Sequence, residues 1–431
     1  MKPEENELLT QTGPGTPMGE LFRRFWLPIM LSEELRSPDG APVRVHVLGE
    51  ELVAFRDTDG KIGLIDRYCA HRRADLFFGR NEECGLRCVY HGWKYDVAGN
   101  CVDQPSEPPE YSFKDDIRLA AYPCQEQGGL IWAYMGPPDF PAELPELEWA
   151  RVPASHRYMR KYFVECNYLQ TLEGDIDSTH ARFLHSVLSP QAAGRMQRLQ
   201  GGGLPGQGGN LYAGAANKFH HISVKDTDYG LMYGFRRPAG DEDEDYNWHI
   251  THWLMPSYAL IANGVPGQTL RCNVRIPIDD THFTFFRVQW NPDRPLTPQE
   301  IDEYENGTSF EESIPGTFMP RRNKENDWLI DRELQKSWNY TGIRSIPEQD
   351  QAVTITMGPI ADRTKENLGS SDTAIHHMRQ KLIKAARDLL EGTDPFAAAH
   401  GDVYRVRQLD ILLKKEVDWV EGTQALIKAK A

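Results

Sequence analysis

Two Cys–His pairs constrain the fold of this 431-residue chain more than any other feature. Cys69 and His71 form a C-x-H pair, and Cys88 and His91 form a C-x2-H pair shortly after it. Four side chains that can bind metal, so close in sequence, require two loops that close over one point from opposite sides. The spacing alone leaves three interpretations open, which are a zinc site, an iron–sulfur cluster and a purely structural role.

The mixture of ligands within each pair favours iron–sulfur. Zinc sites usually pair cysteine with cysteine at C-x2–4-C and histidine with histidine at H-x3–5-H. Here each half contributes one thiol and one imidazole, so two thiolates can hold one iron and two imidazoles the other. We therefore predict a [2Fe–2S] cluster held by Cys69, His71, Cys88 and His91.

Composition excludes several other classes of function. The formal net charge of −15, without a long basic run, argues against a nucleic-acid partner. The sequence has no apolar stretch near the roughly 18 residues that a membrane-spanning helix needs. The N-terminus, MKPEENELLTQTG, is polar and acidic where a signal peptide would be basic and then apolar. We expect a cytoplasmic protein.

The distribution of short patterns predicts an α+β organisation. Residues 42–135 are rich in β patterns separated by Asp-Gly and Gly-Asn turns, and a proline-rich stretch at 135–153 predicts an extended linker. Residues 167–185 predict a helix, and 199–217 predict a mobile loop. Strand-like segments follow, which predict an antiparallel sheet, and the remainder is expected to be mainly helical; the segments are 218–226, 230–237, 248–256, 258–265, 270–278 and 282–290.

The Cys–His stretch carries a family resemblance. "CAHR…CVYHGW" resembles the Rieske motif in its form from the Rieske non-haem iron oxygenases that act on aromatic compounds. Arg73 stands where this family commonly has glycine, and Val89 where it commonly has proline. The resemblance implies three parts: residues 1–40 as a helical segment packed on the catalytic domain, 41–140 as an all-β Rieske domain, and 141–431 as a catalytic domain with a central antiparallel sheet flanked by helices.

A second group of metal-binding residues lies in "EGDIDSTHARFLH". His180 and His185 are five residues apart, about 140° out of phase on a regular helix, so we predict a π-bulge or a helix end between them. The stretch resembles the D-x2-H-x4-H iron motif of the same family. By that resemblance His180 and His185 bind a mononuclear Fe(II), with Asp350 as third ligand and Glu348 and Asp327 as weaker candidates. Two histidines and one carboxylate form the facial triad that leaves coordination positions open for dioxygen.

The resemblance also implies the electron path and the partners. Asp177, which on its own could cap a helix, would contact His180 and a Rieske histidine, His91, of a neighbouring subunit. The oxygenase would therefore be a homotrimer or a hexamer of stacked trimers. A separate reductase with flavin and iron–sulfur groups would supply electrons from NADH. We expect neither NAD nor flavin on this chain, which has no glycine-rich dinucleotide fingerprint.

The likeness is greatest to the phthalate, chlorobenzoate and phenoxybenzoate dioxygenase branch. It implies a terminal oxygenase that uses O₂ to dihydroxylate an aromatic carboxylate of the phthalate or substituted benzoate type. O-demethylation of a methoxylated aromatic acid is the first alternative, and an electron carrier without oxygenase activity is a distant one. Our candidates for contact with the substrate are Asn167, Arg195, Arg198, Arg236, His249 and His252.

Overall fold

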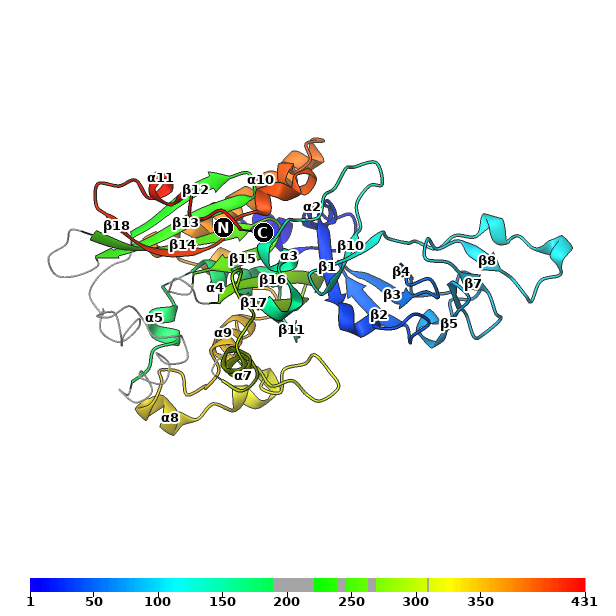
Figure 1. The fold of residues 1–431 in the computed structure, drawn as a ribbon, viewed down its shortest axis with the longest axis horizontal. Coiled ribbons are helices and arrows are strands. Elements are labelled where there is room, and N and C mark those ends of the chain that lie inside the picture. The colour runs from blue at the N-terminus through cyan, green and yellow to red at the C-terminus, as the bar shows by residue number, and fades with distance from the viewer. Residues whose placement is uncertain (178, 189–220, 239–244, 263–268, 308–309, 431) are drawn as a thin grey trace.

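The structure is a computed structural model that describes residues 1–431 except 178, 189–220, 239–244, 263–268, 308–309 and 431. Small β-sheets occupy one end of the elongated molecule, and a large sheet with most of the helices occupies the other (Figure 1). The predicted α+β class is confirmed. In the described part of the chain, no helix combines the length and the apolar character needed to cross a membrane.

Two antiparallel sheets form the end that carries the Cys–His pairs. One contains β2 (Val43–Val47), β3 (Glu50–Arg56) and β4 (Ile62–Asp66); the other contains β5 (Arg80–Glu82), β6 (Gly85–Arg87), β7 (Lys94–Tyr95) and β8 (Cys101–Asp103). They enclose a small apolar core, separate from the main one, to which Cys69 and Cys88 belong. The short strands leave the connecting loops free to meet at the end of the domain.

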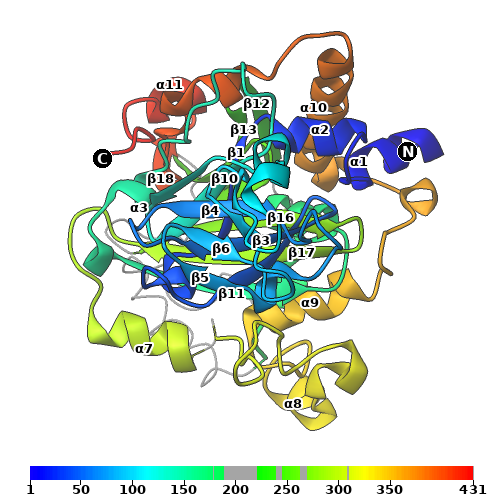
Figure 2. The same ribbon diagram turned by 90° about the vertical axis from the view of Figure 1, so that its right-hand side faces the viewer.

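The N-terminal segment joins the two ends of the molecule. Helices α1 (Pro3–Thr10) and α2 (Pro17–Arg23) pack on α10 (Thr373–Leu390), as Figure 2 shows. The chain then forms β1 (Trp26–Leu31), which pairs with β10 (Leu130–Tyr134), itself paired with β9 (Cys124–Gln127). We did not predict this strand within the helical segment 1–40. All six of its residues are buried, so its apolar run has no polar alternation to identify it.

The large sheet contains every strand expected from the sequence. Its order is β11 (Arg157–Val164), β17 (His282–Trp290), β16 (Leu270–Asp279), β15 (Tyr258–Ile261), β14 (Asp245–Leu254), β13 (Gly230–Pro238) and β12 (His221–Thr227), all antiparallel. The prediction of a mainly helical C-terminal part was incomplete, because β18 (Leu409–Lys414) returns to pair with β14. Strand β15 covers only the end of β14, and β18 pairs with the rest.

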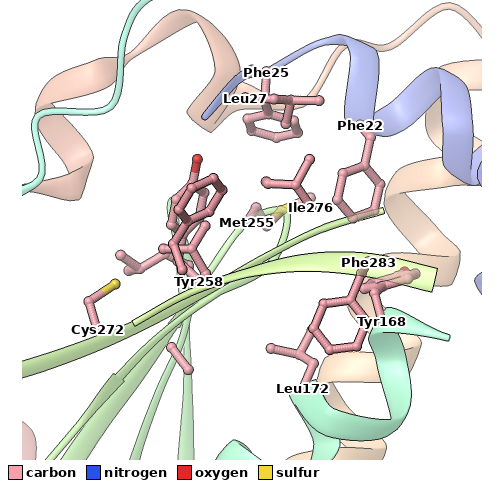
Figure 3. Packing of buried hydrophobic residues seen from close by; sticks show 14 of the residues in the cluster. Phe22, Phe25, Leu27, Tyr168, Leu172, Met255, Tyr258, Cys272, Ile276 and Phe283 are labelled. Carbon is pink, nitrogen blue, oxygen red and sulfur yellow. The ribbon is translucent and has the colours of Figure 1, made fainter. Parts of the chain in front are cut away.

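Cross-strand register divides the large sheet into two faces. On one face, Tyr258 and Ile276 lie beneath Phe25 and Leu27 of the N-terminal segment (Figure 3). We call the opposite face the site face; there Leu172 of α4 (Tyr168–Ile176) lies near Phe283 (Figure 3). The remaining helices are α3 (Glu148–Arg151), within the stretch expected to be extended, α5 (Ala181–Leu184), α7 (Pro298–Asn306), α8 (Arg332–Ser337), α9 (Ile346–Ile355) and α11 (Trp419–Thr423).

Candidate functional site

The two Cys–His pairs meet at the end of the small β-sheets. Cys69 and His71 lie in the loop after β4, and Cys88 and His91 lie in the loop between β6 and β7. Both cysteines are buried, whereas both histidines are half-exposed, and the histidine ring centroids are 4.4 Å apart. Thiols therefore face the protein interior and imidazoles face the surface, an arrangement suited to a cluster with two chemically different irons.

The surrounding polar groups fit a bound cluster. The Tyr95 hydroxyl accepts a hydrogen bond from Ala70 N (3.1 Å) and lies 3.2 Å from Cys69 Sγ. Hydrogen bonds with Cys88 and Tyr95 lower the pKa of the Cys69 thiol to about 6, against the opposing effect of burial. His71 stacks on Trp93 with 4.7 Å between ring centroids, and its Nδ1 is buried with no hydrogen-bond partner among the described residues. A buried nitrogen without a partner is costly unless it binds a ligand, here a metal.

The structure accounts for the two departures from the usual motif. Arg73 has a φ of 59°, in the left-handed region where glycine is the preferred residue. Its guanidinium lies 3.2 Å from Asp66 and over the ring of Tyr68. Val89 is 59% exposed, so no core packing depends on the identity of its side chain. Neither position supplies a ligand.

Arg73→Gly should raise the free energy of unfolding of the Rieske part by about 0.5 kcal/mol or more, because it relieves a left-handed conformation that costs a non-glycine residue about 1 kcal/mol. The Asp66 pair is exposed and offsets little of this. Thermal unfolding followed through the cluster absorbance measures the change. Arg72→Gly is the matched control, since Arg72 lies outside the left-handed region and glycine there should destabilise. Equal effects of the two variants would contradict strain at Arg73.

The second group of metal-binding residues is formed where a helix breaks. The predicted single helix over 167–185 is not observed: α4 ends at Ile176, Asp177 caps it, and a single turn, α5, follows His180. Helix α5 ends at Leu184, so the predicted helix end between His180 and His185 is confirmed, while the earlier break at Asp177 was not predicted. The two histidines flank this turn, and their ring centroids are 5.2 Å apart.

Helix α9 brings Asp350 to these histidines. Asp350 Oδ1 lies 3.1 Å from His185 Nε2 and 3.6 Å from His180 Nε2. The ligand atoms of all three residues lie within 4.8 Å of one another, as a shared metal ion requires. Burial raises the pKa of Asp350, but the adjacent histidines outweigh it and hold that pKa below its usual value. The carboxylate is therefore ionised at neutral pH.

The weaker alternatives for the carboxylate lie elsewhere. Glu348 Oε2 faces Arg322 at 3.4 Å, and burial raises the pKa of Glu348 to about 8, so this side chain is largely protonated at pH 7. Asp327 is exposed and belongs to neither cluster of potential metal ligands among the described residues. The geometry therefore favours Asp350.

Each histidine ring is oriented through its other nitrogen. His185 Nδ1 lies 2.7 Å from Gln349 Oε1, while Gln349 Nε2 donates to Ile343 O. Because Gln349 Oε1 can only accept, His185 Nδ1 carries the proton and Nε2 is left with a lone pair toward Asp350. Asp177 Oδ2 lies 3.4 Å from His180 Nδ1, within ion-pair distance, although that nitrogen makes no hydrogen bond among the described residues. Sequence reasoning missed Gln349, although its place next to Asp350 was a usable signal.

Further hydrogen bonds fix α4 against α9 and the sheet. Gln170 donates to Thr354 O and Gly358 O at the end of α9, and accepts from Ala361 N. Near the end of α4, Asp175 accepts two hydrogen bonds from Asn273 (2.9 and 3.0 Å) and pairs with Arg275. The relative positions of the histidines and Asp350 are thus set by several buried polar contacts.

The structure does not support three of the expected substrate contacts. Asn167 is fully buried as the N-cap of α4, with its amide donating to Thr10 O and Asp280 O. His252 is also fully buried, with one nitrogen near the Tyr229 hydroxyl and the other near Arg407 O. Arg236 stacks over Tyr246 on the face opposite the site face. Arg195 and Arg198, and the expected loop at 199–217, lie outside the described residues.

His249 is the substrate candidate that the structure places on the site face. Its cross-strand neighbours are Phe235 on β13 and Asp410 on β18, and its Nδ1 pairs with the Asp410 carboxylate. Asn167 and His252 lie in the core, where polar residues also serve as helix caps and hydrogen-bond partners, and Arg236 lies on the opposite face.

The two groups of ligands lie far apart within one chain. In Figure 1, α5 and α9 are in the large half of the molecule, while β7 is toward the opposite end. A cluster and an iron bound to these residues of the same subunit would not be neighbours.

Comparison with known proteins gives a family match for each of the two halves of the chain. Residues 25–123 match the Rieske [2Fe-2S] domain, and residues 133–430 match the family described as LigXa C-terminal domain like. The chain is 39% identical to the phthalate 4,5-dioxygenase oxygenase subunit of Pseudomonas putida, over 97% of this chain and 94% of that protein. It is 38% identical to the 3-chlorobenzoate-3,4-dioxygenase oxygenase subunit of Comamonas testosteroni, over 96% of each.

One more relative and one solved structure are also similar to this chain. The 5,5'-dehydrodivanillate O-demethylase oxygenase subunit of Sphingobium sp. is 35% identical, over 91% of this chain and 82% of that protein. The solved structure of NdmA from Pseudomonas putida CBB5, a QL mutant with theobromine, has a TM-score of 0.61 at 18% identity, over 93% of this chain and 99% of that one, so it shows the same fold. The chain belongs to the Rieske oxygenases, oxidoreductases that incorporate O₂ and use a Rieske [2Fe–2S] cluster and a mononuclear iron.

Proposed function

We propose that this oxygenase subunit dihydroxylates an aromatic carboxylate of the phthalate or substituted benzoate type. The observation that carries the proposal is the cluster of His180, His185 and Asp350 at the edge of a buried polar sheet face, in a chain similar throughout to oxygenases named for phthalate and chlorobenzoate. Cys69, His71, Cys88 and His91 hold the [2Fe–2S] cluster, and His180, His185 and Asp350 hold the mononuclear iron.

The bound iron supplies the oxygen chemistry, and the protein supplies geometry and polarity. Gln349 and Asp177 keep the Nε2 atoms of the two histidines directed at the same point as Asp350 Oδ1. A facial set of three ligands would leave the opposite side of a bound iron open for dioxygen and substrate. The half-buried position of His180 and Asp350 leaves room for that approach.

Two further features follow from this proposal. A separate reductase with flavin and iron–sulfur groups supplies the electrons, as the word subunit in the names of the relatives suggests. Since the two ligand groups lie far apart within one chain, the cluster of one subunit serves the iron of its neighbour, in a homotrimer or a hexamer of stacked trimers. Asp177, within reach of His180, lies between the two centres in such an assembly.

O-demethylation is the alternative that a specific observation favours. The relative named for dehydrodivanillate demethylation shares most of its length with this chain. The same three ligands serve both outcomes, and the position of the substrate selects the bond that is oxidised. Two of the three relatives described above are named as dioxygenases, which favours dihydroxylation.

The test combines metal analysis with turnover. The purified protein should contain about three irons per subunit, two in the cluster and one mononuclear. With a reductase and NADH, it should consume O₂ in step with a phthalate or a halobenzoate and yield the cis-diol. Formaldehyde release from a methoxylated acid, without a diol from any benzoate, would instead establish demethylation. About two irons and no substrate-dependent O₂ uptake would contradict both and leave an electron carrier.

A further inference from the structure

The end of helix α4 carries three carboxylates at every second position, Glu173, Asp175 and Asp177. Asp175 pairs with Arg275 of the large sheet, and Asp177 caps the helix beside His180. Residues two apart on a helix point about 200° apart, so Glu173 lies on the side away from the Asp175 contact. There α4 packs against α1 and α10.

Glu173 is bound by arginines through both of its oxygens. Arg363 Nε and Nη2 donate to Glu173 Oε1 and Oε2 at 3.0 and 3.1 Å, and Arg363 Nη1 donates to Asn6 Oδ1 of α1 at 3.1 Å. Arg379 Nε of α10 donates to Glu173 Oε1 at 2.6 Å, and its two Nη atoms bind Glu366 at 2.6 and 2.9 Å. Both arginines are at most 2% exposed. We call these four charged side chains the clamp: Glu173, Arg363, Arg379 and Glu366.

The clamp restricts geometry more than it adds stability. Two arginines and two carboxylates are costly to remove from water, and their mutual attraction repays that cost only when the geometry is good and further hydrogen bonds satisfy the remaining groups. Apolar side chains of similar volume often stabilise a protein equally well in such places. The planar forks of two arginines, however, accept only a narrow range of positions of the carboxylates that they bind. The helices that carry these groups are therefore held in one relative arrangement.

The helical turn that the clamp holds ends at Asp177. Asp177 N donates to Glu173 O at 3.0 Å, so the main chain connects the two residues directly. The Asp177 carboxylate accepts from Thr179 N at 2.6 Å and lies 3.4 Å from His180 Nδ1. A carboxylate that lies beside one imidazole and must also meet a second tolerates little displacement, because about 1 Å is enough to break a hydrogen bond.

We propose that Glu173 is a positioning residue for Asp177, and that the clamp sets the place of the electron bridge between the two metal centres. This inference rests on the proposed electron path through Asp177 and adds to it a residue outside both groups of ligands. Asp175 differs from Glu173 in one respect. Its contacts with Asn273 and Arg275 can share one oxygen, Oδ2, whereas the contacts of Glu173 need both oxygens.

Glu173→Gln tests the clamp, because the amide keeps the size of the side chain but places an NH₂ group where an arginine N–H needs an oxygen. Glu34→Gln is the matched control. Glu34 also binds a largely buried cation, Lys161 Nζ, at 2.8 and 2.9 Å, but a single ammonium can remain on the amide oxygen. In the iron-loaded proteins, hydrogen–deuterium exchange of the Asp177 and Thr179 amides should be about 10-fold faster in Glu173→Gln and unchanged in Glu34→Gln.

A single turnover that starts from the reduced cluster, with substrate and O₂, measures the effect on electron transfer. Reoxidation should be about 10-fold slower in Glu173→Gln and unchanged in Glu34→Gln, with about three irons per subunit in each. If Glu173→Gln does not yield folded protein, Arg379→Lys provides the same two measurements. Its ammonium keeps the positive charge but cannot reproduce the fork that joins Glu173 to Glu366.

The exchange measurement separates this inference from the proposed function. Unchanged exchange in Glu173→Gln, or equal acceleration in Glu34→Gln, would overturn the clamp. Faster exchange with reoxidation at the rate of the wild type would also overturn it, if Asp177→Asn is slow in the same assay. If reoxidation stays fast in Asp177→Asn itself, the proposed electron path is wrong, whereas faster exchange confined to Glu173→Gln would still show that Glu173 holds Asp177 in place.

Discussion

Asp350→Ala should lower the iron content from about three atoms per subunit to about two and reduce turnover by about 100-fold or more. Asp350 Oδ1 faces both histidine Nε2 atoms, and alanine offers no atom to replace it. Two imidazoles on a single helical turn then bind a divalent metal weakly. Metal analysis gives the count. The electron paramagnetic resonance signal of the reduced Rieske cluster, whose ligands lie toward the other end of the molecule, should remain unchanged.

Glu348→Gln is the matched control for Asp350→Ala. Glu348 lies on the same helix two residues earlier, but it faces Arg322 and has a pKa of about 8. Its amide therefore resembles the protonated form that the acid already adopts at pH 7, and three irons should be retained. Loss of the mononuclear iron from Glu348→Gln with retention in Asp350→Ala would reverse the assignment of the ligand.

Sequence reasoning recovered the parts of this molecule that are encoded locally. The cluster ligands fall in two loops between short strands, and the apolar patterns from residue 218 to 290 mark the strands of the large sheet except β11 and β18. His180 and His185 were found because they flank one turn. Asp350, far along the chain, could be assigned only through the family resemblance. Its approach to the histidines depends on the contacts of Gln170 that tie α9 to α4.

The features that escaped prediction depend on distant partners. Strand β18 can pair with β14 only because β15 pairs with one end of β14 and leaves the rest of that edge available. Gln349 matters because Ile343 O fixes its amide and His185 lies beside it. Asn167, predicted as a substrate contact, caps α4, a role for which asparagine is among the preferred residues. Chemical type alone does not separate a cap from a ligand.

Asp177→Asn should leave all of the iron bound and still reduce turnover by roughly 100-fold. Asp177 is not one of the three ligands, so the metal count should not change. Burial opposes its ionisation, but the nearby His180 imidazole and a hydrogen bond from Thr179 N hold the pKa of Asp177 below its usual value, so it is a carboxylate at pH 7. One of its oxygens faces His180 Nδ1, and a carboxylate can accept from a second imidazole as well, which in the proposed assembly is His91 of a neighbouring subunit.

An amide cannot replace that carboxylate, because its NH₂ group would face one of the two imidazole N–H groups. Electron transfer between the centres should therefore slow while each centre stays intact. In a single turnover that starts from the reduced cluster with substrate and O₂, the absorbance of the oxidised cluster should return much more slowly in Asp177→Asn than in the wild type. Asp175→Asn, near the same helix end but bonded to Asn273 and Arg275, is the contrasting variant, and its defect should appear in stability. Rapid return of the absorbance in Asp177→Asn would show that electrons pass between subunits by another route.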